Sequence, residues 1–211
     1  MHFTLPGREQ LKQFTWTGFL VNVWFALVYG YTNYRADLGQ RSFEFFHDWE
    51  LGIPLIPWMI LPYLSLNLLT LTPLFYLSPP EMRRLGRALF AATICAGFIF
   101  YVFPAPIGFL RPDEVPGWNA LYQFLWSLDR TNNTLPSLHI TFSLLTILSI
   151  WSKTGIVERV VLSLWMALIC AAVLFTWQHH IWDVIAGLIL AGLTHKFTGE
   201  PPPESGFSWE L

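Results

Sequence analysis

Two short polar segments of the sequence contain the residue types that acid, base and nucleophilic chemistry requires. They are Leu135-Pro136-Ser137-Leu138-His139 and His179-His180-Ile181-Trp182-Asp183. Each stands at the start of a hydrophobic run that is suited to span a membrane. Polar and ionisable groups are expensive at membrane depth, so their presence at these two positions indicates a functional site.

The second segment pairs an acid with a histidine at helical spacing. Asp183 is the only acid between Glu158 and Glu200, and it follows His179 by four residues. On a helix this spacing places both side chains on one face. The carboxylate could then accept the Nδ1 proton of the imidazole, which would leave Nε2 as a nucleophile or base.

The first segment and an upstream arginine are suited to bind an anion. Ser137 and His139 follow Pro136, and proline is favoured in the first turn of a helix. Free N–H groups and a hydroxyl at a helix N-terminus form a natural anion site. Arg111, in the loop after the third hydrophobic run, adds bidentate donors for phosphate oxygens. These residues predict a phosphoryl-transfer site in which a histidine attacks phosphorus.

The composition indicates that membrane-spanning helices position these residues. Of 211 residues, 54% are hydrophobic and only 12% are charged, and the mean hydropathy is +0.44. A soluble domain could hardly tolerate this balance, and the net charge of −2 argues against a nucleic-acid partner. Cys95 and Cys170 lie in apolar runs at unrelated spacing, which favours neither a metal site nor a disulfide.

The hydrophobic pattern predicts an all-α integral membrane protein with six transmembrane helices. About 20 mostly apolar residues cross a bilayer, and the runs that approach this length are 14–34, 53–77, 88–104, 136–151, 160–177 and 181–194. A tight turn at 177–180 should separate the last two. We therefore expect a single membrane domain over residues 1–197 and a disordered, proline-rich tail over 198–211.

The distribution of positive charge predicts the orientation. Eight of the twelve Lys and Arg residues fall on the side of the termini, and four on the other side: Arg35, Arg41, Arg111 and Arg130. The positive-inside rule then places both termini in the cytoplasm and the two polar segments on the non-cytoplasmic face of the cell membrane.

Two outer loops have the pattern of interfacial helices that could frame a lipid entrance. Residues 37–50 mix acids with aromatic side chains, and residues 117–130 place apolar side chains at helical spacing. Asp129 and Arg130 are expected in a solvated turn at the end of the second loop. Asn132 and Asn133 are expected to cap the approach to the fourth helix.

The two polar segments resemble motifs of the type 2 phosphatidic acid phosphatase (PAP2) superfamily. Pro136-Ser137-Leu138-His139 is similar to its Pro-Ser-Gly-His motif, with Leu138 in place of the usual glycine. His179, Asp183 and Gly187 match the closing His-x-x-x-Asp-x-x-x-Gly motif. Proline patterns at 53–57 and 103–112 are similar to those of the branch that contains inositol phosphorylceramide synthases, and the similarity covers roughly residues 43–192.

The resemblance implies a PAP2-like helical bundle and a role for each motif residue. His179 would form a phosphohistidine, Asp183 would orient it, and His139 would protonate the leaving oxygen. Ser137 and the backbone at Leu138 would form the phosphate cradle. Arg111 matches the arginine of the first family motif. The family chemistry implies no metal and no cofactor.

Two cations of the family pattern are missing, and their absence bears on the substrate. The expected lysine falls on Pro104 and an expected arginine on Val173. A phosphomonoester dianion needs more counter-charge than a diester monoanion, so we expect transfer or hydrolysis of a phosphodiester headgroup. The alternative is a phosphomonoester phosphatase, for phosphatidic acid or a polyprenyl phosphate, in which Arg130 supplies a replacement charge.

Other interpretations of the same residues stay open. An intramembrane His or Asp can serve helix packing, and His139, His179 and Asp183 could in principle bind zinc. A non-catalytic lipid transporter or binding protein could keep the fold. His180 is more consistent with a structural or interfacial role than with a catalytic one. The expected partners are a lipid phosphate and the bilayer, and the sequence predicts no oligomeric state.

Overall fold

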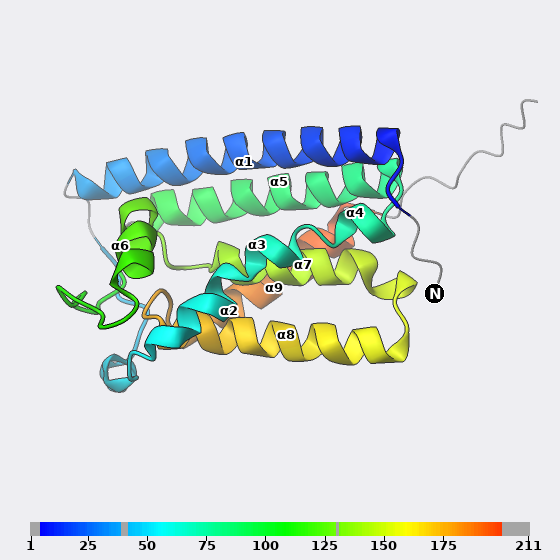
Figure 1. Ribbon diagram of the computed structural model, residues 1–211. Coiled ribbons are helices and arrows are strands. Elements are labelled where there is room, and N and C mark those ends of the chain that lie inside the picture. The colour runs from blue at the N-terminus through cyan, green and yellow to red at the C-terminus, as the bar shows by residue number, and fades with distance from the viewer. Residues whose placement is uncertain (1–4, 39–41, 130, 200–211) are drawn as a thin grey trace, which may run out of the picture.

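The computed structural model describes residues 5–38, 42–129 and 131–199, and every regular element in these ranges is a helix. Each of the six predicted hydrophobic segments is helical in whole or in part. Arg130 and nearly all of the predicted tail lie outside the described residues. The helices run along one common direction in Figure 1, apart from the short α6 at one end.

Two long helices pack side by side along the length of the bundle (Figure 1). They are α1, Arg8–Asp37, and α5, Pro79–Val102. The start of α5 is fixed by prolines in its first turn and by a capping box in which Glu81 accepts hydrogen bonds from the N–H and hydroxyl of Ser78. Small buried side chains of α5, Ala88, Ala92 and Ala96, allow close approach of neighbouring helices.

The second hydrophobic segment forms a broken helix. Its pieces are a 3₁₀ turn at Pro57–Met59, α2 at Ile60–Leu64, α3 at Leu66–Leu69 and α4 at Pro73–Tyr76. Pro73 has no N–H to donate and its ring clashes with the carbonyl four residues earlier, which explains the break before α4. Polar side chains near the breaks satisfy freed carbonyls: the Ser65 hydroxyl donates to Pro62, and the Thr72 hydroxyl to Leu69.

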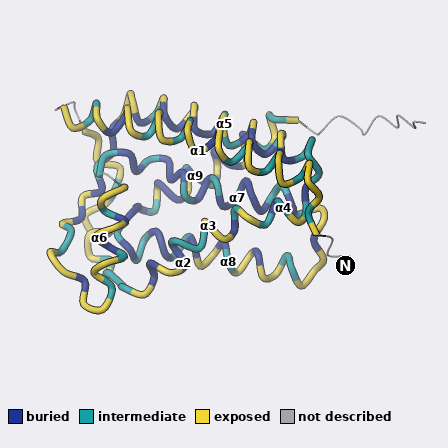
Figure 2. The backbone as a smooth tube through the Cα atoms, turned by 45° about the horizontal axis from the view of Figure 1, so that its top comes forward, coloured by how far each residue is buried: buried dark blue, intermediate teal, exposed yellow. Residues whose placement is uncertain are grey.

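The remaining helices form the centre and one side of the bundle. They are α7, Leu138–Ile150, α8, Ile156–Phe175, and α9, Ile181–Phe197, with a 3₁₀ turn at Trp151–Lys153. Figure 2 shows that α7 and α9 are largely buried, whereas α1 and α8 have long exposed stretches. The predicted turn at 177–180 separates α8 from α9, and Trp177 adopts a left-handed backbone conformation there.

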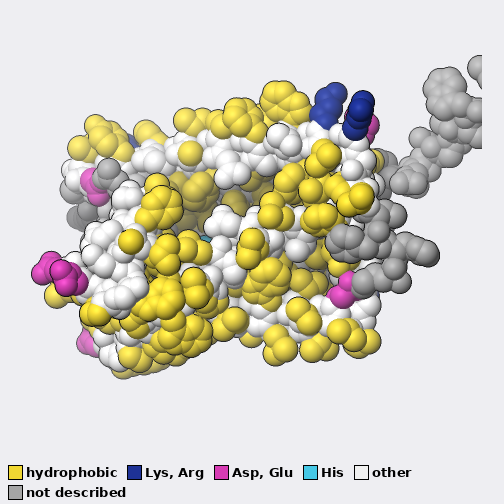
Figure 3. Space-filling view, in the orientation of Figure 1, with side chains coloured by type: hydrophobic (Ala, Val, Ile, Leu, Met, Phe, Trp, Pro, Cys, Tyr) yellow, Lys and Arg dark blue, Asp and Glu magenta, His cyan; other side chains and the backbone are white. Residues whose placement is uncertain are grey.

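Three helical stretches of the described residues are long and apolar enough to cross a membrane: Pro57–Tyr76, Pro79–Val102 and Ile156–Phe175. The stretch Leu138–Lys153 is apolar but shorter, so the six-span count stays a prediction. Hydrophobic side chains cover the middle of the face in Figure 3, and charged side chains gather toward its ends. Both ends of the described chain lie at one end of the bundle (Figure 1).

The outer loops agree in part with the prediction of interfacial helices. Residues 117–130 contain α6, Asn119–Leu128, which lies across the end of the bundle opposite the termini (Figure 1). Tyr122 and Leu125 of α6 are buried in the core. In the loop 37–50, α1 ends at its first residue, Asp37, and the described residues 42–47 form no helix before the 3₁₀ turn Asp48–Gly52. A full helix was therefore the wrong expectation there.

Candidate active site

His179 stands directly before His180, the N-cap residue of α9, so the pair with Asp183 forms across the start of the helix and not on one helical face. The Nδ1 of His179 donates to the carbonyl oxygen of Thr134 at 3.0 Å and lies 3.4 Å from Oδ2 of Asp183. Asp183 therefore lies near Nδ1, as the spacing suggested, but the Thr134 carbonyl is the closer of the two partners. Because a carbonyl oxygen only accepts, the bond to Thr134 fixes the proton on Nδ1 and leaves Nε2 without one.

Asp183 has a second role at the start of α9. Its Oδ2 accepts a hydrogen bond of 2.8 Å from the backbone N–H of His180, which is the N-cap residue. A carboxylate in the first turn also interacts favourably with the helix dipole. Asp183 is 1% exposed, so it is held rigidly beside His179.

Ser137 caps α7 and links it to α9. Its hydroxyl oxygen accepts from the N–H of Ile140 at 3.3 Å, and its own N–H donates to the carbonyl of Asp183 at 3.0 Å. The side chain is fully buried. The Ser137 hydroxyl is already engaged in the helix cap, whereas Leu138 lines the adjoining cavity. The phosphate cradle at Ser137 and Leu138 therefore stays a prediction.

The close contact between α7 and α9 depends on a glycine. A Cβ atom at Gly187 would lie 2.6 Å from the carbonyl oxygen of Ser137 and 3.1 Å from Cβ of Ile140. The hydroxyl of Thr141 bridges the same contact, since it donates to the carbonyls of Ser137 at 2.8 Å and Gly187 at 3.0 Å. The glycine of the second sequence motif therefore sets the spacing between the helices that begin beside His139 and His179.

His139 lies in the first turn of α7 and faces the same cavity as His179. Its ring stacks on the ring of Tyr63 at a centroid distance of 4.1 Å, and its Nε2 donates to the carbonyl of Tyr63 at 2.7 Å. A carbonyl oxygen only accepts, so Nε2 carries a proton and Nδ1 is the nitrogen left for chemistry. The broken helix after residue 56 thus holds the second histidine in place.

Asp129 is a site residue that the sequence analysis assigned wrongly to a solvated turn. Its carboxylate accepts hydrogen bonds from the hydroxyls of Tyr29 and Tyr63, and it lines the cavity together with His139 and His179. The tyrosines stand 100 and 66 positions away in the sequence, so no local pattern could have revealed the cluster.

The two asparagines expected to cap the fourth helix hold other partners. Asn133 donates to the hydroxyl of Thr32 at 2.6 Å and to the carbonyl of Tyr29 at 3.2 Å, which ties the loop before α7 to α1. Asn132 donates to the carboxylate of Asp37 at 2.9 Å. The helix cap itself is Ser137, so the capping prediction was wrong for both residues.

Arg111 binds the C-terminal end of α6. Its guanidinium donates to the carbonyls of Asp129 at 2.9 Å and Trp126 at 3.4 Å, and it lies over the Trp126 ring. Partial burial lowers the pKa of Arg111, and the Asp129 carboxylate opposes this effect. Arg111 does not line the cavity, although its buried Nε has no hydrogen-bond partner among the described residues. Phosphate binding by Arg111 stays a prediction, and Arg130 lies outside the described residues.

His180 belongs to a buried cluster that joins the outer loops. Its Nε2 donates to the carbonyl of Ile107 at 2.7 Å, and its ring stacks between Phe46 and Phe109. Glu50 lies 3.5 Å from Nδ1 of His180 and also accepts from the N–H of Ile181 at 2.9 Å. These contacts hold the His180 ring in the packed interior, which agrees with the predicted structural role of this residue. Sequence reasoning missed Glu50, which is completely buried.

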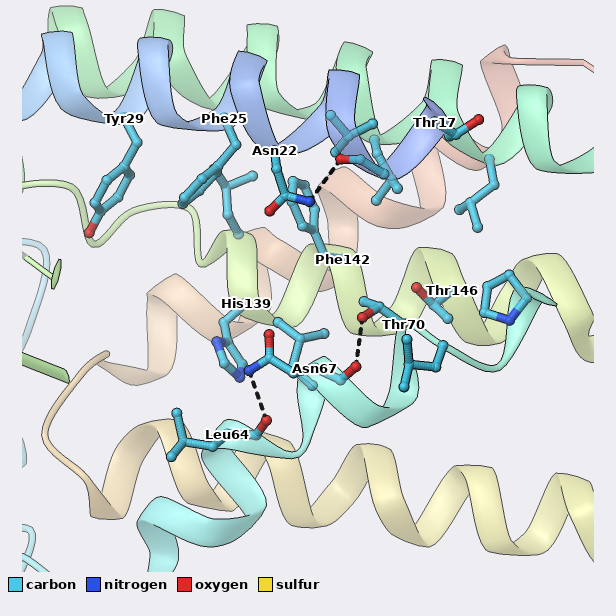
Figure 4. A pocket seen from close by; sticks show the side chains of 18 of the residues that line it. Thr17, Asn22, Phe25, Tyr29, Leu64, Asn67, Thr70, His139, Phe142 and Thr146 are labelled. Atoms are coloured by element: carbon cyan, nitrogen blue, oxygen red, sulfur yellow. Dashed lines mark hydrogen bonds between the residues drawn. The ribbon is translucent and has the colours of Figure 1, made fainter. Parts of the chain in front are cut away.

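The histidines open onto a cavity of about 560 Å³ between α1, the broken helix and α7 (Figure 4). Its walls are mainly apolar. Among the described residues that line it there is no Lys or Arg, whereas Asp129 contributes a carboxylate. The described residues contain no group of three His, Cys, Asp or Glu side chains placed to hold a metal ion, so His139, His179 and Asp183 do not form such a group.

A comparison with family models matches residues 59–197 to the PAP2 superfamily. The chain belongs to the PAP2 superfamily. The match covers both histidine segments and the helices that position them. Members of the PAP2 superfamily are generally phosphatases, so the chain has the domain of a phosphatase-type membrane protein. The match does not support the inositol phosphorylceramide synthase branch in particular. No curated protein and no solved structure matches the chain.

Proposed function

We propose that this protein is a lipid phosphatase or phosphotransferase that cleaves a lipid phosphate ester through a phosphohistidine at His179, without a metal. The observation that carries the proposal is the position of His179. Nδ1 is held by Thr134 and Asp183, and Nε2 has no hydrogen-bond partner in the described part of the chain. The cavity that His179 lines also holds His139, so an attacking nitrogen and an acid lie around one space.

The reaction would proceed in two steps. Nε2 of His179 attacks phosphorus and the bond from phosphorus to the leaving oxygen breaks. His139, which must enter this step with a proton on both ring nitrogens, gives the leaving oxygen the proton from Nδ1. In the second step an acceptor hydroxyl attacks the phosphohistidine, His139 takes up its proton, and His179 is released. Water as the acceptor gives a phosphatase, and a lipid or polyol hydroxyl gives a phosphotransferase.

The charge around the cavity favours a phosphodiester. A phosphomonoester dianion would meet the Asp129 carboxylate on a wall whose described lining has no Lys or Arg. Arg111 is held at the end of α6 by two carbonyls. A diester monoanion needs less counter-charge in such a low-dielectric site. A lipid donor with a phosphodiester headgroup is therefore the substrate that we propose, with a phosphomonoester as the alternative.

Matched donors would test this proposal. The purified protein is given a phosphomonoester and a phosphodiester of the same lipid, and release of phosphate and of the headgroup are both measured. We expect turnover of the diester and a loss of several orders of magnitude in His179→Ala. Efficient monoester hydrolysis without a diester reaction would replace the headgroup proposal with the phosphatase alternative. Binding without any turnover would point to a non-catalytic lipid-binding protein.

The proposed location of the reaction is the non-cytoplasmic face. His139 and His179 stand at the starts of α7 and α9, which face the end of the bundle opposite the described termini (Figure 1). Most of the Lys and Arg residues are predicted on the side of the termini. Reporter fusions after Leu110 and Trp177 should report the non-cytoplasmic side, and a fusion after Arg84 the cytoplasmic side. The reverse pattern would move the reaction to the inner leaflet.

A further inference from the structure

A second space, the α1–α5 groove, lies between the two long helices and contains neither histidine of the site. It has a volume of about 630 Å³, and its described lining comes from these two helices alone. Most of that lining is apolar, and its polar and charged members gather where both helices begin: Gln13, Thr17, Arg83 and Arg87. The helices run side by side from the end of the bundle where the described termini lie (Figure 1). The groove therefore has a charged end and an apolar remainder.

Contacts between α1 and α5 fix the shape of the groove. A Cβ atom at Gly86 would lie 2.6 Å from Cγ2 of Thr17, so the helices are in close contact at this level. Further from the charged end, the ring of Trp24 stacks on the ring of Phe90 at a centroid distance of 4.5 Å. The stretch of α5 over residues 83–94 is about 16 Å long, and the hydrocarbon of one leaflet is about 15 Å thick. The length of the groove therefore matches that of an acyl chain in one leaflet.

The charged end of the groove has positive charge without a protein counter-charge. A guanidinium nitrogen of Arg83 donates to Oε1 of Gln13 at 3.1 Å, and Nε2 of Gln13 donates to the hydroxyl of Thr17 at 2.9 Å. These bonds tie Arg83 to α1. Arg87 lies one turn later on the same face of α5, is exposed, and has no hydrogen-bond or ion-pair partner within residues 5–38, 42–129 and 131–199. The described lining of the groove includes no Asp or Glu, so both guanidinium groups are available to an anion.

We infer that the α1–α5 groove binds an anionic phospholipid that is not the substrate. The headgroup phosphate would pair with Arg83 and Arg87, and an acyl chain would lie along the apolar part of the groove. A zwitterionic headgroup would bring its own cation close to the same arginines, so a headgroup with a net negative charge is favoured. Thr17 and Val21 line both this groove and the histidine cavity, so α1 is a wall of each. The bound lipid would therefore steady one wall of the cavity from outside it.

The test measures binding of phosphatidylglycerol and phosphatidylcholine with the same acyl chains to the purified protein in detergent, by native mass spectrometry. We expect phosphatidylglycerol to bind about tenfold more tightly. The double variant Arg83→Gln, Arg87→Gln should weaken its binding about fivefold for each arginine and remove most of the preference. The matched control is Arg8→Gln with Lys12→Gln, which removes the same charge from exposed positions of α1 that do not line the groove. This control should leave the affinity within about twofold of the native value.

A second variant tests the apolar part of the groove. Ala91→Phe keeps both arginines but fills space beside the acyl chain, and it should weaken phosphatidylglycerol binding about fivefold, as the loss of contact with one or two CH₂ groups predicts. An equal loss in the Arg8 and Lys12 control would show general attraction to positive charge and would overturn the inference. Unchanged binding in Ala91→Phe, or a dimer that carries no lipid, would also overturn it. Arg87→Gln alone replaces the double variant if that protein does not fold. The measurement needs no turnover, so its result is independent of the proposed reaction.

Discussion

Replacement of Gly187 by alanine tests whether the contact between α7 and α9 sets the geometry of the site. The added Cβ would lie 2.6 Å from the carbonyl oxygen of Ser137, so the helices must separate by about 0.8 Å to restore an ordinary contact. The movement would shift His139 relative to His179. Displacement of catalytic groups by about 1 Å can lower the rate about 100-fold, and overpacking costs about 1–3 kcal/mol of stability.

The same helix supplies a control for this prediction. Gly192 also lies in α9, but a Cβ atom there would meet nothing within 4 Å. Gly192→Ala should leave turnover unchanged, and the better helix propensity of alanine should raise stability by up to about 1 kcal/mol. The assay measures kcat/KM on the preferred lipid donor and thermal unfolding in the same detergent. If Gly187→Ala matches Gly192→Ala in both measurements, the close contact does not position the histidines.

Three further predictions concern the groups around the site. Asp183→Asn should lower kcat about 100-fold without abolishing it, because Thr134 still holds the Nδ1 proton of His179; unchanged turnover would show that the carbonyl suffices. Glu50→Gln should lower the free energy of unfolding by about 1–3 kcal/mol, seen in thermal unfolding, since the amide cannot accept as many hydrogen bonds as the carboxylate. Activity should survive prolonged EDTA treatment if an imidazole is the nucleophile, and recovery only on adding zinc or magnesium would contradict this mechanism.

The sequence predicted the parts of the site that depend on local order. Hydrophobic runs located the helical segments, and the spacing of His179 and Asp183 identified a pair that the structure places 3.4 Å apart. The break in the second segment could have been expected from Pro73. The turn between α8 and α9 was also predicted from its polar residues. In each case the signal lies within a few neighbouring residues, where propensity and periodicity act.

The remaining parts of the site depend on contacts between distant segments. The nearest partner of His179 is a backbone carbonyl of Thr134, and any residue type has such a carbonyl. The bond from the N–H of Ile181 to Glu50 spans 131 positions, and that from Tyr29 to Asp129 spans 100. Such pairs follow from the packing of whole helices and loops, which the single sequence does not specify. Asp129 therefore looked like a loop residue until α1 and the broken helix were placed beside it.

The two carboxylates near the cavity are stabilised in different ways, and the difference bears on substrate choice. Asp183 accepts a backbone N–H at the positive end of α9, so its charge is balanced by the helix as well as by His179. Asp129 receives its hydrogen bonds from two neutral tyrosine hydroxyls, while the nearby Arg111 binds carbonyls at the end of α6. Arg111 interacts with the Asp129 charge from outside the cavity, and within the described lining no Lys or Arg stands between that carboxylate and a bound anion. It would repel a dianion more strongly than a monoanion, and Asp129→Asn should weaken the preference for a diester while Asp183→Asn should not change it.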